Sequence, residues 1–196
     1  EVAGKAQRTA AAFAPYIAEG YDVVALTASC GLMMKFEWPL ILPEDETVKR
    51  LSAATKDVAE YVVELSRTFG LAPGLTPVEG GVTFHHACHA RAQNMGAKSA
   101  EMLRLIPDTK VDIIERCSGH GGTFGVMKDT RPMAVKVGRP TARQVAAKGN
   151  PVLCSDCPLA CKHLGQLVAA DAKPDAPPPP REAHPVEIFA RAYGVF

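Results

Sequence analysis

The chain has 196 residues, of which 47% are hydrophobic and 22% charged, so it has the composition of a folded domain with a core rather than of a disordered segment. Its 22 basic and 21 acidic residues leave a net charge of +1, which excludes the strongly basic footprint typical of nucleic-acid-binding proteins. No apolar run approaches the roughly 20 residues that a membrane-spanning helix needs.

The first half of the chain predicts helical segments on either side of one strand. Residues 3–19 carry apolar positions at helical spacing and end at Gly20, which favours a helix end. The β-branched run 21–29 predicts a buried strand that leads directly to Cys30. Residues 44–69 have the apolar spacing of one long amphipathic helix, or of two.

The second half alternates between strand and helix patterns. Residues 71–81 are rich in Pro and Gly and predict a loop. Strands are expected over 81–87, 110–116 and 151–154, leading to Cys88, Cys117 and Cys154. Helices are expected over 94–105, 133–148 and 158–170, with a break at Pro140 in the second of these.

This alternation predicts an α/β fold with an open, mostly parallel sheet and flanking helices. In such sheets ligands bind beyond the carboxyl ends of the strands. Because four expected strands each lead to a cysteine, we expect the cysteines to converge at the C-terminal ends of the strands, although they are far apart in the sequence.

Three segments are expected along the chain. Residues 1–172 form the domain, the proline-rich stretch 173–183 is an extended linker without regular packing, and 184–196 is a helical tail. The N-terminus is polar and lacks the pattern of a secretory signal. We therefore expect a cytoplasmic protein with reduced thiols, in which the six cysteines serve a site rather than disulfides.

The spacing of the cysteines indicates a metal or cluster site. Cys154 and Cys157 lie three residues apart at an expected strand-to-helix turn, with Cys88 and Cys117 upstream. Pairs of thiolates combined with distant single ones supply iron–sulfur clusters, and zinc accepts the same donors. Cys161 lies one helical turn after Cys157 and is expected to pack in the helix core.

The glycine-rich loop 115–125, ERCSGHGGTFG, is open to two other interpretations. Its glycines miss the dinucleotide-binding spacing by one place, and no phosphate-binding Lys-Ser/Thr pair follows them. A nucleophile formed by Cys117 and His120 is chemically feasible. It leaves the other cysteines without a role, so the cluster interpretation is favoured.

The pattern resembles the cysteine-rich CCG domain shared by heterodisulfide reductase and the iron–sulfur subunits of anaerobic glycerol-3-phosphate dehydrogenase and glycolate oxidase. The segments that carry the resemblance, in order, are TASCGLMMKFEWP (27–39), HHACHAR (85–91), the loop 115–125 and CSDC (154–157). The likeness covers about 1–170. Proteins of this kind commonly carry two such units and a ferredoxin-like segment, so this chain is expected to be the C-terminal unit of a longer protein.

The resemblance implies a [4Fe–4S] cluster bound by Cys88, Cys117, Cys154 and Cys157. Ser118 stands where the family has the second cysteine of its CCG motif, so a cubane cluster is expected rather than a non-cubane one, unless Cys30 or the Ser118 oxygen adds a fifth ligand. Around the ligands we expect a second set of residues that orient or hydrogen-bond them: His85, His89, Gly119, His120 and Gly121.

By the same resemblance, the chain is expected to pass electrons from a flavin-containing dehydrogenase subunit, with a ferredoxin-like domain or subunit, toward a quinone or other carrier. Peripheral association with the inner face of a membrane is compatible with this role, and no nucleic-acid partner is expected. Two alternatives stay open, a thiol–disulfide (heterodisulfide) reductase site and a zinc-stabilised interaction module without redox activity.

Overall fold

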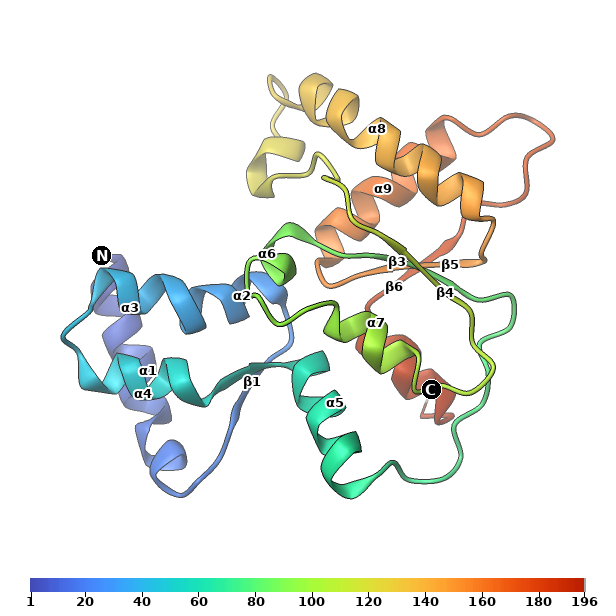
Figure 1. The fold of residues 1–196 in the computed structure, drawn as a ribbon. Helices are drawn as coiled ribbons and strands as arrows, with labels where there is room; N and C mark the ends of the chain where they lie inside the picture. The colour runs from blue at the N-terminus through green and yellow to red at the C-terminus, as the bar shows by residue number, and fades with distance from the viewer. Residues whose placement is uncertain (196) are drawn as a thin grey trace.

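The protein is described by a computed structural model that covers residues 1–195 (Figure 1). Its main feature is a parallel sheet of β3 (Val82–His85), β4 (Val111–Ile114), β5 (Val152–Ser155) and β6 (Arg181–Ala183). The strand order is β4-β3-β5-β6, and Val82 lies opposite both Val111 and Val152. All four strands therefore end at the same edge, which confirms the expected α/β class.

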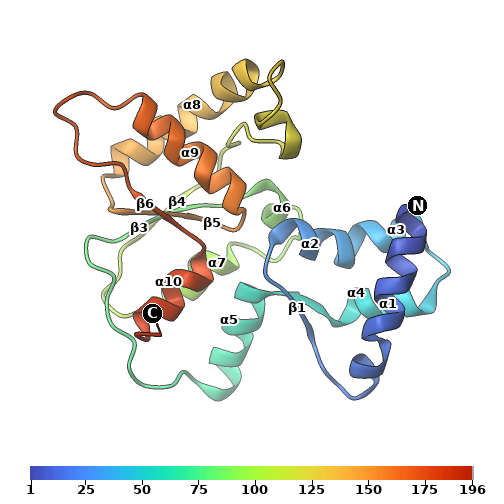
Figure 2. The same ribbon diagram turned by 180° about the vertical axis from the view of Figure 1, so that it is seen from behind.

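Helices cover both faces of this sheet. On one face lie α8 (Arg131–Lys148) and α9 (Pro158–Ala170); on the other lie α5 (Val58–Phe69), α7 (Lys98–Leu103) and α10 (Pro185–Ala192). Figures 1 and 2 show these layers from opposite sides. Phe84 is completely buried under the α7 and α10 layer, whereas Leu153 is buried under α8 and α9. The strand pleat explains this division, because successive side chains point to opposite faces.

The proline-rich segment ends in a strand, which corrects the expectation that 173–183 has no regular packing. Arg181–Ala183 forms β6 and pairs in parallel with β5, with Cys154 opposite Ala183. The strand forms there because β5 would otherwise be an edge with unpaired backbone groups. The tail helix α10 follows at once, and its Ile188 and Phe189 are buried in the same core as Phe84.

Helix α8 runs without interruption through Pro140, so the expected break is wrong. A proline in a helix removes one backbone hydrogen bond and crowds the preceding turn. Here α8 is held along its length by packing against α9, with Ala142 and Val145 buried in their shared core.

The N-terminal part forms a second packing unit beside the sheet. It contains α1 (Val2–Ala18), β1 (Val23–Ala25), α2 (Ala28–Leu32), the π-helix η1 (Met33–Glu37), α3 (Trp38–Ile41), α4 (Glu46–Ala54) and β2 (Thr55–Asp57). Its core is formed by small residues of α1 against Trp38, Val48 and Leu51. The strands β1 and β2 pair only with each other, in parallel, so the first expected strand lies outside the main sheet.

The region 44–69 is two helices separated by β2. Asp57 ends the strand and also caps α5, since its carboxylate accepts a hydrogen bond from the Ala59 N–H at 2.9 Å. Glu60 returns a bond to the Asp57 N–H and completes a capping box. This capping fixes the start of α5 directly after β2.

Short elements occupy the edge of the sheet where the strands end. Helix α6 (Cys88–Arg91) follows β3, and the 3-10 turn η2 (Gly122–Gly125) follows β4. The helix expected over 94–105 begins only at Lys98, because Asn94 and Gly96 have left-handed backbone angles.

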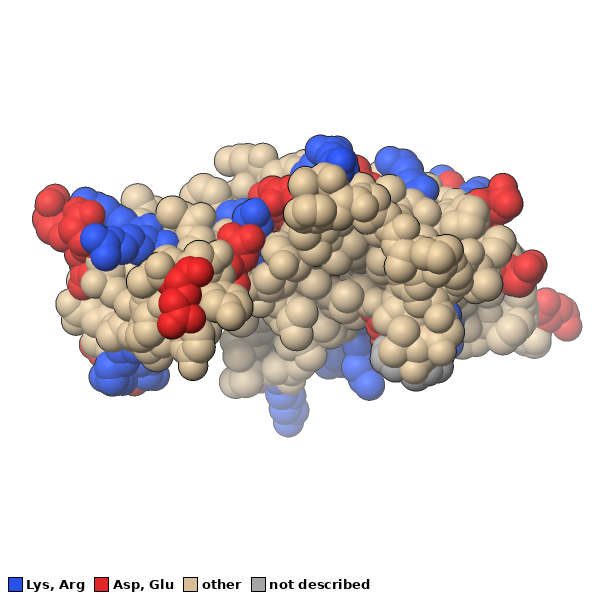
Figure 3. Space-filling model, turned by 90° about the horizontal axis from the view of Figure 1, so that it is seen from below, with Lys and Arg blue, Asp and Glu red and all other residues tan. Residues whose placement is uncertain are grey.

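Acidic and basic side chains are interspersed on the face seen in Figure 3, around a broad area that carries neither. This face shows no continuous basic stripe of the kind that binds nucleic acid. Among the described residues, no helix has both the length and the apolar character needed to cross a membrane.

Candidate functional site

Three cysteines follow three neighbouring strands at the carboxyl edge of the main sheet. Cys88 is the first residue of α6 after β3, Cys117 comes three residues after β4, and Cys157 comes two residues after β5 and caps α9. Cys88 and Cys117 are exposed and Cys157 is partly buried. The expected convergence is therefore found for these three thiols, because parallel strands in register end together.

His85 ties the ends of the three strands together beneath these cysteines. Its Nε2 lies 2.9 Å from the Arg116 carbonyl, and its Nδ1 lies 2.9 Å from the Ser155 hydroxyl. A carbonyl can only accept, so Nε2 carries the proton and Nδ1 accepts from Ser155. Burial lowers the pKa of His85, which keeps this neutral form.

The Ser155 oxygen in turn accepts a bond from the Cys157 N–H at 3.3 Å. His85 was expected to orient or bond the ligands; the structure places it in backbone and hydroxyl contacts that position the turns before Cys117 and Cys157.

The glycine-rich loop packs tightly against α8. Gly119 has a φ of +77°, and a Cβ there would lie 2.2 Å from the Ala134 carbonyl and 2.7 Å from the Gly138 nitrogen. The Thr141 hydroxyl donates to the Cys117 carbonyl at 2.7 Å and fixes the loop from the helix side. The Gly119 N–H points to the Cys117 Sγ at 3.3 Å. A backbone donor to this sulfur favours its thiolate form and resembles the hydrogen bonds that tune cluster potentials.

Cys154 lies inside β5 and is completely buried. Its neighbours across the sheet are Phe84 and Ala183, and it belongs to the core on the α7 and α10 side. Burial raises the pKa of its thiol well above the ordinary value. The structure thus does not present Cys154 at the edge with the other three, because its position in the pleat directs it into the core.

Cys161 packs in the core as expected. It is buried between α9 and the sheet, and its Sγ lies 3.4 Å from the Leu153 carbonyl. Burial raises its pKa to about 12, so it is a neutral thiol.

Cys30 is exposed on α2, which packs against α6, the helix that begins with Cys88. The contact is held by Gln93, whose amide donates to the Ala28 carbonyl at 3.1 Å. Gly31 makes this approach possible, since a Cβ there would lie 3.0 Å from the Gln93 amide nitrogen. The N-terminal unit thus brings a further free thiol to the side of the site where Cys88 lies.

Ser118 and His120 turn into the protein rather than toward solvent. Ser118 is buried, and its Oγ accepts from the His120 N–H at 3.4 Å. The His120 ring lies 6.0 Å from the ring of His163, and burial lowers the pKa of both histidines. Within residues 1–195 the Nε2 of each has no hydrogen-bond partner.

His89 and Gly121 have simpler surroundings. His89 is exposed on α6, and its side chain makes no hydrogen bond or ion pair within the part of the chain that is described. Gly121 has a left-handed φ of +54° and lies against the Phe124 side chain, so it shapes the turn into η2.

Asp156 is a buried acid that sequence reasoning missed, because it stands as a spacer between Cys154 and Cys157. It is 3% exposed, accepts a hydrogen bond from the Ser99 hydroxyl, and interacts with the Ala87 backbone. Burial raises its pKa to about 7, with further contributions from its hydrogen bonds and the nearby Asp57. Its position inside the CSDC motif was the available signal, since a charged residue between two sites of burial needs partners.

Among residues 1–195, no three His, Cys, Asp or Glu side chains are arranged to hold one metal ion. The donor chemistry at the edge nevertheless fits a thiolate-bound centre. Cys88, Cys117 and Cys157 are accessible thiols at one edge, and the loop that carries Cys117 supplies an N–H to its sulfur. Cys154, as placed, does not contribute to this set.

Comparison with known proteins identifies the segment that carries these thiols. Residues 82–163 match the family model of the cysteine-rich CCG domain. This segment is a CCG cysteine-rich domain. It contains β3, β4 and β5 together with Cys88, Cys117, Cys154 and Cys157.

Curated relatives extend the similarity beyond this domain. The chain is 27% identical over 177 residues to a subunit of the anaerobic glycerol-3-phosphate dehydrogenase of Escherichia coli K12, which covers 89% of this chain and 41% of that protein. It is 31% identical over 113 residues to lactate utilization protein A of Lysinibacillus sphaericus, covering 53% of this chain and 47% of that protein. The chain thus spans less than half the length of either relative.

Proposed function

We propose that this chain is an iron–sulfur electron-transfer module of an oxidoreductase. The observation that carries the proposal is the set of three accessible thiols at the ends of three adjacent parallel strands, in a segment of the CCG family. An iron–sulfur cluster supplies one-electron transfer when bound. The relatives are named as a dehydrogenase subunit and a lactate utilization protein, which supports a redox role.

Within this proposal, Cys88, Cys117 and Cys157 are the first three ligands, and Cys154 is the fourth on the family pattern. Cys154 is the third residue of the four-residue strand β5, so a change confined to the end of that strand would re-aim its side chain. Cys30 is the alternative fourth ligand, because it is exposed on a helix that packs against the helix of Cys88.

The cluster proposed is a [4Fe–4S] cubane. A non-cubane cluster in this family uses the second cysteine of the CCG motif, and Ser118 stands there instead. The Ser118 hydroxyl accepts a bond from the loop backbone, which supports a structural role for it. The loss of that thiolate also makes a heterodisulfide reductase site the weaker alternative.

As partners we propose a flavin-containing dehydrogenase subunit and a ferredoxin-like domain or subunit, with a quinone or another carrier as the electron acceptor. A cytoplasmic location, with peripheral attachment to a membrane through a partner, agrees with this arrangement. The domain division proposed is 1–172 for the CCG-type unit, with 184–196 as the tail that follows the linker.

Anaerobic purification followed by iron, sulfide and zinc analysis and EPR spectroscopy tests the proposal. We expect about four iron and four sulfide per chain and an EPR signal that appears on reduction. Stoichiometric zinc without iron would contradict it and would establish the zinc-stabilised module. Replacement of Ser118 by Cys tests the cluster type, since the EPR signature is expected to change only if this position sets it.

A further inference from the structure

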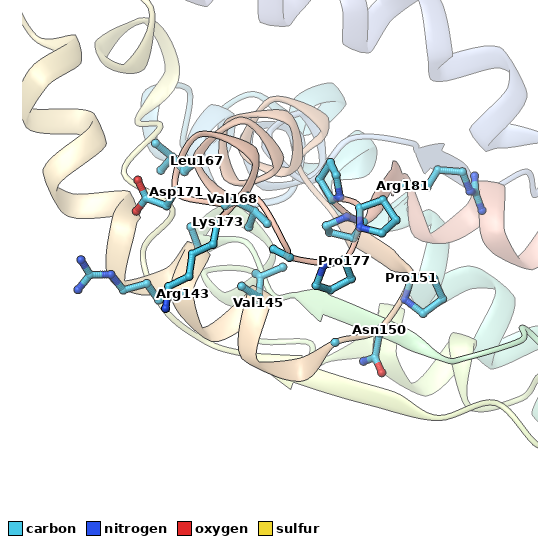
Figure 4. Close-up of a pocket in the computed structure, with 18 of the residues that line it drawn as sticks. Arg143, Val145, Asn150, Pro151, Leu167, Val168, Asp171, Lys173, Pro177 and Arg181 are labelled. Atoms are coloured by element: carbon cyan, nitrogen blue, oxygen red, sulfur yellow. The ribbon is translucent and has the colours of Figure 1, made fainter.

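A large cavity lies at the opposite edge of the sheet from the cysteines (Figure 4). It has a volume of about 940 Å³ and is bounded by the second half of α8, the end of α9 and the proline-rich segment. Asn150 and Pro151 precede β5, and Arg181 begins β6, so the cavity is at the amino ends of these strands. From Cys157 to Leu167 the helix α9 spans about 15 Å, which separates this cavity from the thiols.

The interior of the cavity is apolar. Val145, Leu167 and Val168 line it and belong to the core between α8, α9 and the sheet. The facing wall is the run Pro177–Pro180, which offers no backbone N–H groups. Cavities of several hundred Å³ with such walls are typical of sites that bury the apolar body of a small organic molecule.

The charged residues of the lining are mostly cations. The lining contains Arg139, Arg143, Lys173 and Arg181, against the single carboxylate of Asp171. This is a local excess in a chain whose net charge is only +1. Arg139 already neutralises Asp171 at 2.9 Å, and Arg181 lies 3.7 Å from Glu187.

The side chains of Arg143 and Lys173 have no hydrogen-bond or ion-pair partner within residues 1–195. Figure 4 shows both on the side of the cavity where Asp171 lies. Two cations without partners beside an apolar interior complement a ligand that has an apolar body and one anionic end.

We propose that this cavity binds a small amphipathic organic anion, with its apolar body between α9 and the proline wall and its carboxylate at Arg143 and Lys173. The carboxylate forms charge-assisted hydrogen bonds with both cations. A free small molecule is favoured over a membrane surface because the site is recessed between three elements of the chain.

Isothermal titration calorimetry with decanoate, below its critical micelle concentration, tests the proposal on the purified chain. We expect saturable binding of one decanoate per chain, and at least tenfold weaker binding of acetate and of decyltrimethylammonium. The double variant R143Q/K173Q should weaken decanoate binding at least tenfold. The control K136Q/K162Q removes two exposed cations of α8 and α9 that do not line the cavity and should leave the affinity unchanged.

A second pair of variants tests the cavity itself without altering charge. Ala146 is exposed and lines the cavity, whereas its neighbour Ala147 is exposed and does not. A146W should abolish decanoate binding and A147W should preserve it, with unchanged circular dichroism for both. The proposal is overturned if decanoate does not bind, if R143Q/K173Q binds like the wild type, or if the chain binds phosphatidylglycerol vesicles but no free decanoate.

Discussion

Replacing Gly119 by Ala tests whether the close packing of the glycine-rich loop on α8 positions Cys117. The new Cβ would lie 2.2 Å from the Ala134 carbonyl and 2.7 Å from the Gly138 nitrogen, both backbone atoms that cannot move aside easily. Overpacking of this kind costs about 1–3 kcal/mol. The left-handed φ of +77° adds about 1–2 kcal/mol for a residue with a Cβ. We therefore expect G119A to lower the free energy of unfolding by about 2–5 kcal/mol.

The matched control is G122A in the same loop. Gly122 also has a left-handed φ, +61°, but no atom lies within 4 Å of its Cβ position, so only the backbone cost of about 1–2 kcal/mol applies. Urea unfolding of the cluster-free chain, followed by circular dichroism, gives both values. Iron retention in the reconstituted chain should fall for G119A more than for G122A. Equal unfolding free energies for the two variants would refute the packing argument.

Three further predictions concern side chains around the site. His85→Ala leaves the Ser155 hydroxyl and the Arg116 carbonyl without their buried partner and should cost about 2–4 kcal/mol in urea unfolding, whereas His89→Ala on the exposed face of α6 should stay within about 0.5 kcal/mol; similar losses for both would contradict the role given to His85. Because the folded-state pKa of Asp156 is raised to about 7, above its ordinary 3.8, the folded state holds the proton more tightly, and the stability of the cluster-free chain should fall as the pH rises from about 4 to 7. Asp156→Asn should remove most of that decline, and an unchanged pH profile would show that Asp156 is ionised at no cost. Cys161→Ala should retain full iron content while losing about 1 kcal/mol of stability, since its thiol is a buried core group, and loss of iron in this variant would make it a ligand.

The parallel sheet could be predicted from the sequence because its first three strands are β-branched apolar runs followed by turns. Cys88 and Cys117 follow β3 and β4 as expected, since parallel strands in register end at one edge. The two strands that were missed, β2 and β6, have three residues each and little apolar character. Each exists because a neighbouring strand leaves backbone groups free to pair, which is a tertiary effect without a local signal.

The position of Cys154 shows what spacing alone does not determine. A Cys-x-x-Cys pair at a strand end has both thiols at the site only if the strand ends before the first cysteine. Here β5 continues through Cys154 to Ser155, so the pleat directs Cys154 into the core. The roles of Gly119 and His85 also depend on residues far away in sequence, Ala134 and Ser155, and could not be derived from local pattern.

The central claim is that the thiols at the carboxyl edge of the sheet bind an iron–sulfur cluster, and iron content after anaerobic reconstitution tests it most directly. Single Cys→Ser variants at 88, 117 and 157 should each lose most of the iron, and the variant at 161 should keep it. Iron loss at either 154 or 30, but not both, identifies the fourth ligand. Full iron content in the variants at 88, 117 and 157 would contradict the account.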